Sequence, residues 1–276
     1  MLKKAANFLF FLSIALVFAS GCSHYSKMLK STNTDAKLDY AIELYNKKQY
    51  FKALPLFEEL VTVYRGTKKA EKIYYYYAYT NYKLEDYETA AFDFENFART
   101  FPTSEYAEEC AFMHAYCFYQ DSPDYTLDQT STVKAINELQ LFTDRFQSSS
   151  RIEQCNSLID QLRLKLETKA FDNAMLYFHM DEFKAAVTAF RIVLHDYPAG
   201  KFREESSFMI IKAWYQLAEN SIETKKEERY KESLKAFNEF ASKFSESKFK
   251  KDADDLSVLV RKRLEKINPS EFSLKN

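Results

Sequence analysis

Histidine and cysteine are the side chains of this 276-residue chain best suited to catalysis or metal binding, and their spacing shows which chemistry is open to them. The histidines form no HExxH pair and stand apart, as His24, His114, His179 and His195. The sequence also has no Gly-rich phosphate loop, no GxSxG turn and no CxxC pair. We therefore expect no enzymatic activity, no metal site and no cofactor.

Three cysteines lie in the body of the chain. Cys110 and Cys117 are seven residues apart on one expected helix, about 10.5 Å along its axis, which is too far for a disulfide without unfolding that helix. Cys155 could in principle pair with either. Burial as small apolar side chains is the simpler expectation for all three, although an oxidising compartment leaves a disulfide open.

The N-terminal segment has the features of an export signal. Lys3 and Lys4 precede an apolar run at 8–18, which at eleven helical residues would cover only roughly half of a ~30 Å hydrocarbon core. Residues 19–22, Ala-Ser-Gly-Cys, resemble a lipoprotein signal box, with Ala19 where Leu is usual. The resemblance implies removal of residues 1–21 and lipidation of Cys22. An ordinary secretory peptide with a chance cysteine is the alternative.

The residues after Cys22 indicate where the anchor is placed. Ser23 stands where an inner-membrane retention signal would usually show Asp, and no acidic run follows that would resemble a surface-export tag. We therefore expect a lipid anchor on the periplasmic face of an outer membrane, held stably by more than one acyl chain. Residues 22–34 would form the lipidated tether, with folded structure beginning near Asp35.

The chain beyond the tether repeats one pattern: an aromatic residue, a small residue three positions later, and an aromatic residue or Leu four positions after that. The small residues of the five copies are Ala53, Ala90, Ala135, Ala186 and Ser233. A small residue lets two helices of a hairpin approach closely, and the ring packs on the same face. Only three Gly and five Pro are available for the turns of a β fold. We expect an all-α fold, an α-solenoid of about five helix hairpins that resemble tetratricopeptide repeats.

Aromatic side chains crowd the first helices of the second and third repeats. Six of them fall at repeat positions that usually face the groove of such a solenoid: Tyr75, Tyr79, Tyr82, Phe112, Tyr116 and Tyr119. Tyrosine joins a large apolar face to a hydroxyl that can stay hydrated, which suits the gripping of an extended peptide. We hypothesise a peptide groove across the first three repeats, and the alternative is that most of these rings are core.

Charge is nearly balanced over the whole chain but uneven along it. The formal net charge of −1 gives no reason to expect nucleic acid as a partner. Residues 85–128 hold eleven acidic residues and one basic residue, whereas residues 223–266 hold thirteen basic and ten acidic. An acidic patch in the first stretch would steer a basic partner, and solvated helix faces are the alternative.

The chain resembles the BamD family, the lipoprotein subunit of the outer-membrane β-barrel assembly machine. The resemblance rests on the signal box, the number of repeats and two particular segments. Residues 118–136, FYQDSPDYTLDQTSTVKAI, are similar to the long loop region of the family's third repeat. Residues 169–206 are similar to its fourth repeat, with Ala174, Tyr177 and Tyr197-Pro198 in place. Gln147 and Ser245 stand where closing prolines are usual, which puts only the geometry of those helix ends in doubt.

The resemblance implies a non-enzymatic adaptor. Repeats 1–3, at 35–147, would receive unfolded β-barrel precursors, and repeats 4–5, at 148–268, would dock on the periplasmic domains of a BamA-like barrel-forming subunit. Other assembly lipoproteins would be further partners, and residues 269–276 would be a tail. By elimination, the docking surface is expected within 205–265, with Trp214, Tyr215, Arg261, Lys262 and Arg263. The alternative for the basic cluster Arg261-Lys262-Arg263 is that its positive charges only stabilise the negative end of a helix dipole.

Two other classes of protein would use similar parts. A periplasmic tetratricopeptide scaffold for another envelope complex would carry the same repeats, and a pilotin would also carry the signal box. A glycan-binding lipoprotein would need Trp and Tyr platforms on long loops, and this chain has a single Trp. Identification of the partners that co-purify from the outer membrane would separate these classes.

Overall fold

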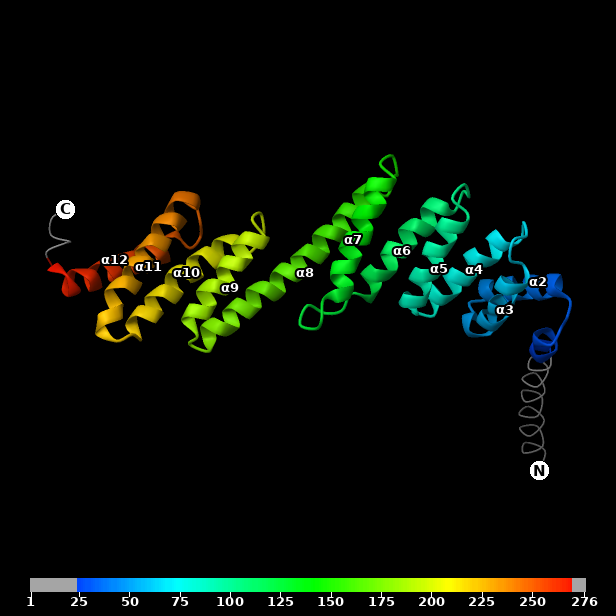
Figure 1. Cartoon of the computed structure of the whole chain (residues 1–276), viewed down its shortest axis with the longest axis horizontal. Coiled ribbons are helices and arrows are strands. Elements are labelled where there is room, and N and C mark those ends of the chain that lie inside the picture. Colours follow the sequence, from blue (N-terminus) through cyan, green and yellow to red (C-terminus); the bar gives the residue numbers. More distant parts are fainter. Residues whose placement is uncertain (1–23, 270–276) are drawn as a thin grey trace, which may run out of the picture. The chain divides into compact units, whose positions relative to one another are not determined.

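The computed structural model describes residues 24–269, and within that range every regular element is helical (Figure 1). The helices are α2 (Thr34–Asn46), α3 (Tyr50–Val63), α4 (Ala70–Lys83), α5 (Tyr87–Thr100), α6 (Ala107–Asp121), α7 (Thr130–Arg145), α8 (Ile152–His179), α9 (Phe183–Asp196), α10 (Arg203–Glu219), α11 (Glu223–Lys243) and α12 (Lys250–Ile267). The expected all-α fold of helix hairpins is confirmed. Within residues 24–269, no helix combines the length and apolar character needed to cross a bilayer.

The described residues form two compact units. Residues 24–122 and 133–156 make up unit 1, and residues 123–132 and 157–269 make up unit 2. Consecutive helices pack on one another from α2 to α6 in unit 1 and from α9 to α12 in unit 2, and contacts also join α2 to α4 and α10 to α12. Such contacts between neighbouring hairpins bury the apolar face that each hairpin alone would expose.

The small residues of the repeated pattern lie inside the helix packing. All five small residues are fully buried. In the first four copies, the residue four positions later is fully buried as well: Phe57, Phe94, Leu139 and Phe190. The fifth copy differs, because Phe237 is half-buried and Ala236 and Phe240 enter the core of unit 2 instead. The Ser233 hydroxyl is satisfied inside the core, where it donates to the Ile211 carbonyl oxygen over 3.0 Å.

The turn inside each of three hairpins contains one residue with left-handed backbone. These residues are Lys48 (φ 58°), Glu85 (φ 64°) and Asp181 (φ 59°). In each turn the next amide N–H donates to the carbonyl five residues before it, as in the 3.0 Å bond from Glu182 to Tyr177. This pattern satisfies carbonyls that the helix end would otherwise leave unpaired.

Replacing Asp181 by Gly is expected to stabilise the protein by about 0.5–1 kcal/mol, because Gly adopts positive φ without the steric cost of a Cβ. Urea unfolding followed by circular dichroism would measure the change. Asp181→Ala is the matched control, since it removes the carboxylate and keeps the Cβ. Equal stability of the Gly and Ala variants would contradict the prediction.

Three joints between consecutive hairpins carry the same side-chain hydrogen bond. A serine hydroxyl donates to a glutamate at the start of α4, α6 or α10, in the pairs Ser104–Glu71 (2.5 Å), Ser149–Glu108 (2.6 Å) and Ser247–Glu204 (2.7 Å). In the loop between α9 and α10, Gly200 stands at the position that the serine occupies in the other three joints. There the buried Glu167 carboxylate accepts from the backbone N–H groups of Lys201 (3.1 Å) and Phe202 (2.7 Å).

Helical structure is already present at residues 24–29, so the folded part begins earlier than the expected Asp35. The Tyr25 hydroxyl donates to the Lys52 carbonyl over 3.2 Å, and the fully buried Lys37 ammonium donates to the Leu29 carbonyl over 3.1 Å. Glu59 holds that ammonium at 2.6 Å. These contacts attach part of the expected tether to the first hairpin, while the signal segment and Cys22 lie outside the described residues.

The helices that lack a closing proline end as the others do. Amide N–H groups of Phe146 and Phe244 donate to carbonyls four residues earlier over 2.9 Å, as that of Phe101, which precedes Pro102, also does. The doubt raised by Gln147 and Ser245 is thereby removed. The aromatic residue packs on the preceding turn, with ring centroids 5.0 Å apart for Phe142–Phe146 and 5.5 Å for Phe240–Phe244. The same ring contact joins Phe97 to Phe101, which precedes Pro102, at 5.1 Å.

Candidate functional site

Helices α4 and α6 bring the six predicted aromatic residues into one continuous series in unit 1. Ring centroids lie 4.7 Å apart for Tyr75–Tyr79, 6.3 Å for Tyr79–Tyr82 and 6.5 Å for Tyr82–Tyr116. Phe112 and Tyr119 both stack on Tyr116, each at 5.5 Å. We call these six residues the aromatic ribbon. Side chains one helical turn apart stand on the same face of a helix, which is why the spacing in the sequence joins them.

The ribbon consists of a buried support and a half-buried surface. Its five tyrosines are half-buried, whereas Phe112 is only 3% exposed and packs edge-on against Phe142 at 5.7 Å. The expectation that Phe112 faces a groove is therefore wrong: its ring belongs to the core, where it backs Tyr116. Tyr106 lengthens the ribbon at the other end, with its centroid 4.7 Å from that of Tyr75.

Glu109 of α6 is the polar centre of the ribbon, and the sequence analysis missed it. Its carboxylate accepts from the Tyr79 hydroxyl and, at 3.5 Å, from the Tyr75 hydroxyl. Burial, followed by the charge of Glu109, raises the pKa of Tyr75 to about 12, and burial followed by the Glu109 hydrogen bond also raises that of Tyr79. Burial raises the pKa of Tyr82 to about 12. The hydroxyls therefore stay neutral donors at physiological pH.

Cations stand at two places beside the ribbon. Lys83 Nζ lies 5.3 Å from the centroid of Tyr82, and the Arg151 guanidinium lies 4.5 Å from that of Phe112. Such contacts are attractive because the face of an aromatic ring is electron-rich. The ribbon therefore combines ring faces, neutral hydroxyls, one carboxylate and two neighbouring cations.

The residues predicted for partner docking do not form one surface in unit 2. Trp214 packs against the larger core cluster, with its indole N–H buried and without a hydrogen-bond partner among the described residues. Tyr215 packs on a separate cluster around Tyr230, with ring centroids 6.1 Å apart. Arg263 forms a two-bond pair with Glu219, at 2.9 and 3.1 Å, which joins α12 to α10.

The remaining members of the basic cluster are available. Arg261 and Lys262 are exposed on α12. Burial alone would raise the pKa of Glu219, but the Tyr230 hydrogen bond together with the charge and hydrogen bond of Arg263 lowers it below its usual value. Arg263 is thus a structural residue, and Arg261 and Lys262 are the docking candidates that remain.

His114 and the cysteines of the described range serve packing. His114 Nδ1 lies 2.8 Å from the Ala91 carbonyl and therefore donates to it, and Nε2 lies 3.2 Å from the Glu138 carboxylate. All three cysteines in the described range are buried free thiols, which confirms their expected role as small apolar side chains. Burial raises the pKa of Cys117 to about 12, so it stays a thiol.

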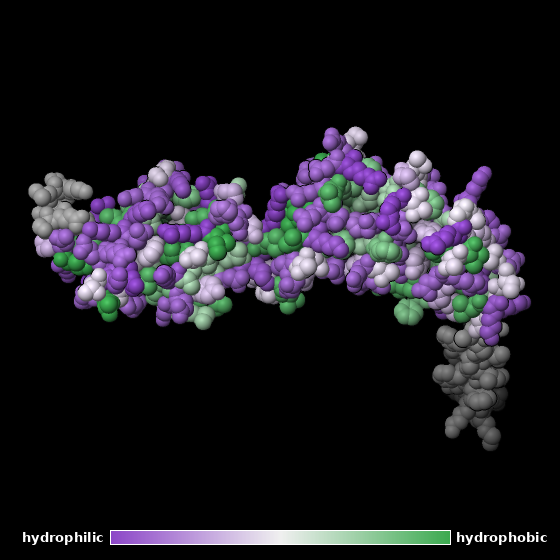
Figure 2. Space-filling model, in the orientation of Figure 1, coloured by the Kyte–Doolittle hydropathy of each residue, from purple (hydrophilic) through white to green (hydrophobic). Residues whose placement is uncertain are grey.

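The three most exposed apolar side chains of the described residues stand apart from one another. Phe51, Phe92 and Ile222 are 83%, 62% and 72% exposed and stand on different helices or loops. Figure 2 shows small hydrophobic groups separated by hydrophilic side chains over the face in view. Isolated exposed apolar residues are ordinary on a protein surface.

The stacked helix hairpins define a helical-repeat protein. A family model described as YfiO, outer membrane lipoprotein, matches residues 34–230, which is more than half of the chain. The chain therefore belongs to this family of outer membrane lipoproteins, and its resemblance to BamD is confirmed.

The outer membrane protein assembly factor BamD of Caulobacter vibrioides is 21% identical over 142 residues, which are 51% of this chain and 47% of that protein. The chain thus matches about half the length of this relative. Among solved structures, the complex of the TPR2AB domain of yeast Sti1 with pHSP90 superposes with a TM-score of 0.39 at 13% identity, covering 82% of this chain and 98% of that one.

Proposed function

We propose that this protein is a non-enzymatic subunit of the machinery that assembles β-barrel proteins in the outer membrane, anchored by lipid on Cys22 to the periplasmic face. The aromatic ribbon would receive unfolded barrel precursors. The observation that carries the proposal is the continuous series of five half-buried tyrosines on two consecutive repeats. Membership of the outer membrane lipoprotein family, and the name of the Caulobacter relative as an assembly factor, support it.

The ribbon suits a transient grip on an unfolded chain. Ring faces bind apolar and aromatic side chains by area and quadrupole attraction, and the hydroxyl oxygens can accept from main-chain N–H groups that an unfolded segment leaves unbonded. Because no bond is made or broken, the precursor can be passed on by simple dissociation. Repeats 1–3, at 35–147, would thus bind the substrate.

Repeats 4–5, at 148–268, would dock on the periplasmic domains of a BamA-like barrel-forming subunit, together with other assembly lipoproteins. The exposed cations Arg261 and Lys262 on α12 are the docking candidates that the structure leaves unpaired among the described residues. They would pair with acidic side chains of the partner and so set register and association rate.

Tagged full-length protein, solubilised from outer membrane in detergent, is expected to co-purify a barrel-forming subunit. The double substitution Arg261→Glu and Lys262→Glu should reduce that recovery at least about tenfold, since two attractive charges become repulsive. Lys250→Glu with Lys251→Glu is the matched control, on exposed residues at the other end of α12. Recovery of only division or pilus components would contradict the proposal and favour a scaffold or pilotin.

A further inference from the structure

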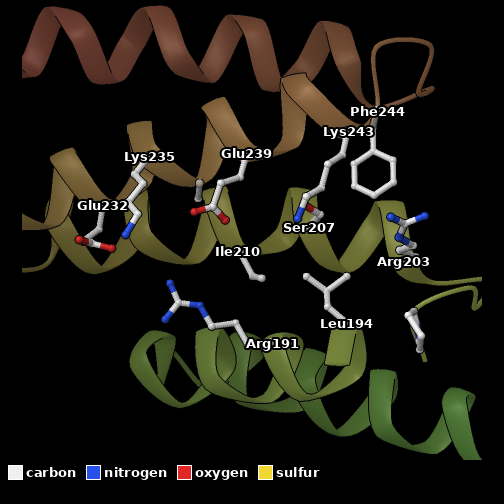
Figure 3. A pocket seen from close by; sticks show the side chains of 12 residues that line it. Arg191, Leu194, Arg203, Ser207, Ile210, Glu232, Lys235, Glu239, Lys243 and Phe244 are labelled. Atoms are coloured by element: carbon white, nitrogen blue, oxygen red, sulfur yellow. The ribbon is translucent and has the colours of Figure 1, made fainter. Parts of the chain in front are cut away.

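Unit 2 contains a hollow of about 280 Å³ between α9, α10 and α11 (Figure 3). Its apolar lining includes Leu194 of α9, Ile210 of α10 and Phe244 at the end of α11. The hollow is not evident in the sequence, because its lining residues come from three helices and are spread over residues 191–244.

Charged side chains surround this hollow. Four are basic and two are acidic: Arg191, Arg203, Lys235, Lys243, Glu232 and Glu239. Among the described residues, none of the four cations has a carboxylate within ion-pair distance, and the Arg203 guanidinium lies instead 5.0 Å from the centroid of Phe244. Figure 3 shows Arg191 rising from α9 opposite the charged side chains of α11. The excess of unpaired positive charge favours an anionic partner.

A matching hollow in unit 1 shows which features are particular to unit 2. It is lined by α5, α6 and α7, and aligning the repeats places Pro102 with Pro198 and Phe146 with Phe244. The hollow is thus a product of the repeat geometry. In unit 1 its charges balance, with two basic and two acidic residues, and Glu95 stands where unit 2 has Arg191.

The charge pattern indicates what kind of anion fits. Glu232, Lys235, Glu239 and Lys243 alternate in sign along one edge of α11, over about 16 Å of helix. This row of side chains is longer than a single phosphate group, and its two carboxylates would repel a phosphate. A phosphate ion is therefore a poor fit for the hollow. An amphipathic protein segment can instead space its acidic side chains to meet the cations and lay an aliphatic side chain on the apolar lining.

We propose that this hollow is a docking site for an acidic amphipathic helix of a partner protein. Arg191 and Lys235 hold carboxylates of the segment from opposite sides, and an aliphatic residue between those carboxylates packs on Leu194 and Ile210. The site is separate from the aromatic ribbon and does not depend on the function proposed for it.

The probe is a dye-labelled, Ala-rich helical peptide of roughly twelve residues, with a Leu pair flanked by a Glu one turn away on each side. Fluorescence anisotropy with the full chain in detergent is expected to show binding that Arg191→Glu and Lys235→Glu each weaken at least about tenfold. Lys184→Glu is the matched control, because it makes the same kind of charge reversal at an exposed position of α9. It should change the affinity less than about twofold.

Two comparisons decide the outcome. The same peptide with Lys for Glu should not bind the wild-type protein and should gain affinity for the Arg191→Glu variant. Equal losses in Arg191→Glu and Lys184→Glu would overturn the site in favour of general attraction. Arg191-dependent binding of phosphatidylglycerol vesicles without binding of the acidic peptide would overturn it in favour of a lipid headgroup.

Discussion

Replacing Tyr75 and Tyr116 together by Ala is expected to weaken binding of a peptide that ends in an aromatic residue by about tenfold to a hundredfold. Tyr75 joins Tyr79 to Tyr106, and Tyr116 joins Tyr82 to Tyr119 and Phe112, so the double variant interrupts the aromatic ribbon at both ends. Each truncation removes a ring face that the peptide would cover. Calorimetry or fluorescence anisotropy on the full chain in detergent would measure the loss.

Two variants separate ring contact from other causes. Phe92→Ala removes a 62% exposed ring of unit 1 outside the ribbon and should leave the affinity unchanged. Tyr79→Phe keeps the ring and removes the hydroxyl with its hydrogen bonds to Glu109 and Tyr75, so it should cost less than about threefold. Unchanged affinity in the Tyr75 and Tyr116 double variant, with native circular dichroism, would refute a role of the ribbon in binding.

Replacing Gly200 by Ala is expected to destabilise the protein by about 2–3 kcal/mol. A Cβ at this position would lie 2.2 Å from Oε1 of Glu167, so the carboxylate must move away from the Lys201 and Phe202 amides. Glu167 is only 4% exposed, and water cannot replace those two bonds. Urea or thermal unfolding would measure the loss.

The serines at the equivalent joints suggest a control variant for the Gly200→Ala prediction. Gly200→Ser adds the same Cβ but brings the hydroxyl that bonds to Glu71 and Glu108 at equivalent joints. We therefore expect Gly200→Ser to lose less than half as much stability as Gly200→Ala. Glu167→Ala should cost a similar amount alone and little more in combination with Gly200→Ala, because both changes remove one interaction. Full additivity would show that Gly200 and Glu167 are not coupled.

Local pattern predicted the parts of this protein that depend on near neighbours in sequence. The repeated small residues and the rings four positions later identified the hairpins, and alignment of the repeats gathered the six aromatic residues that the structure joins. Phe112 was misplaced because aromatic residues lie on nearly every face of α6, and periodicity cannot then distinguish a core ring from a surface ring.

Contacts between distant residues set the rest. Glu109 meets the hydroxyl of Tyr79, which is thirty residues earlier, and Arg263 pairs with Glu219, which is forty-four residues earlier. Neither pairing can be predicted from the residues that are neighbours in sequence. The docking prediction therefore included Trp214 and Arg263, although packing and an ion pair use both of them within unit 2.

The central claim is that the aromatic ribbon contacts barrel precursors in the cell. Its most direct test places a photo-crosslinking phenylalanine analogue at Tyr116 in the full chain, with the same analogue at Phe92 as the control, and identifies the captured proteins after irradiation. We predict that newly exported β-barrel precursors are captured from position 116 and not from position 92. Equal capture at both positions, or capture of no precursor from position 116, would contradict the account.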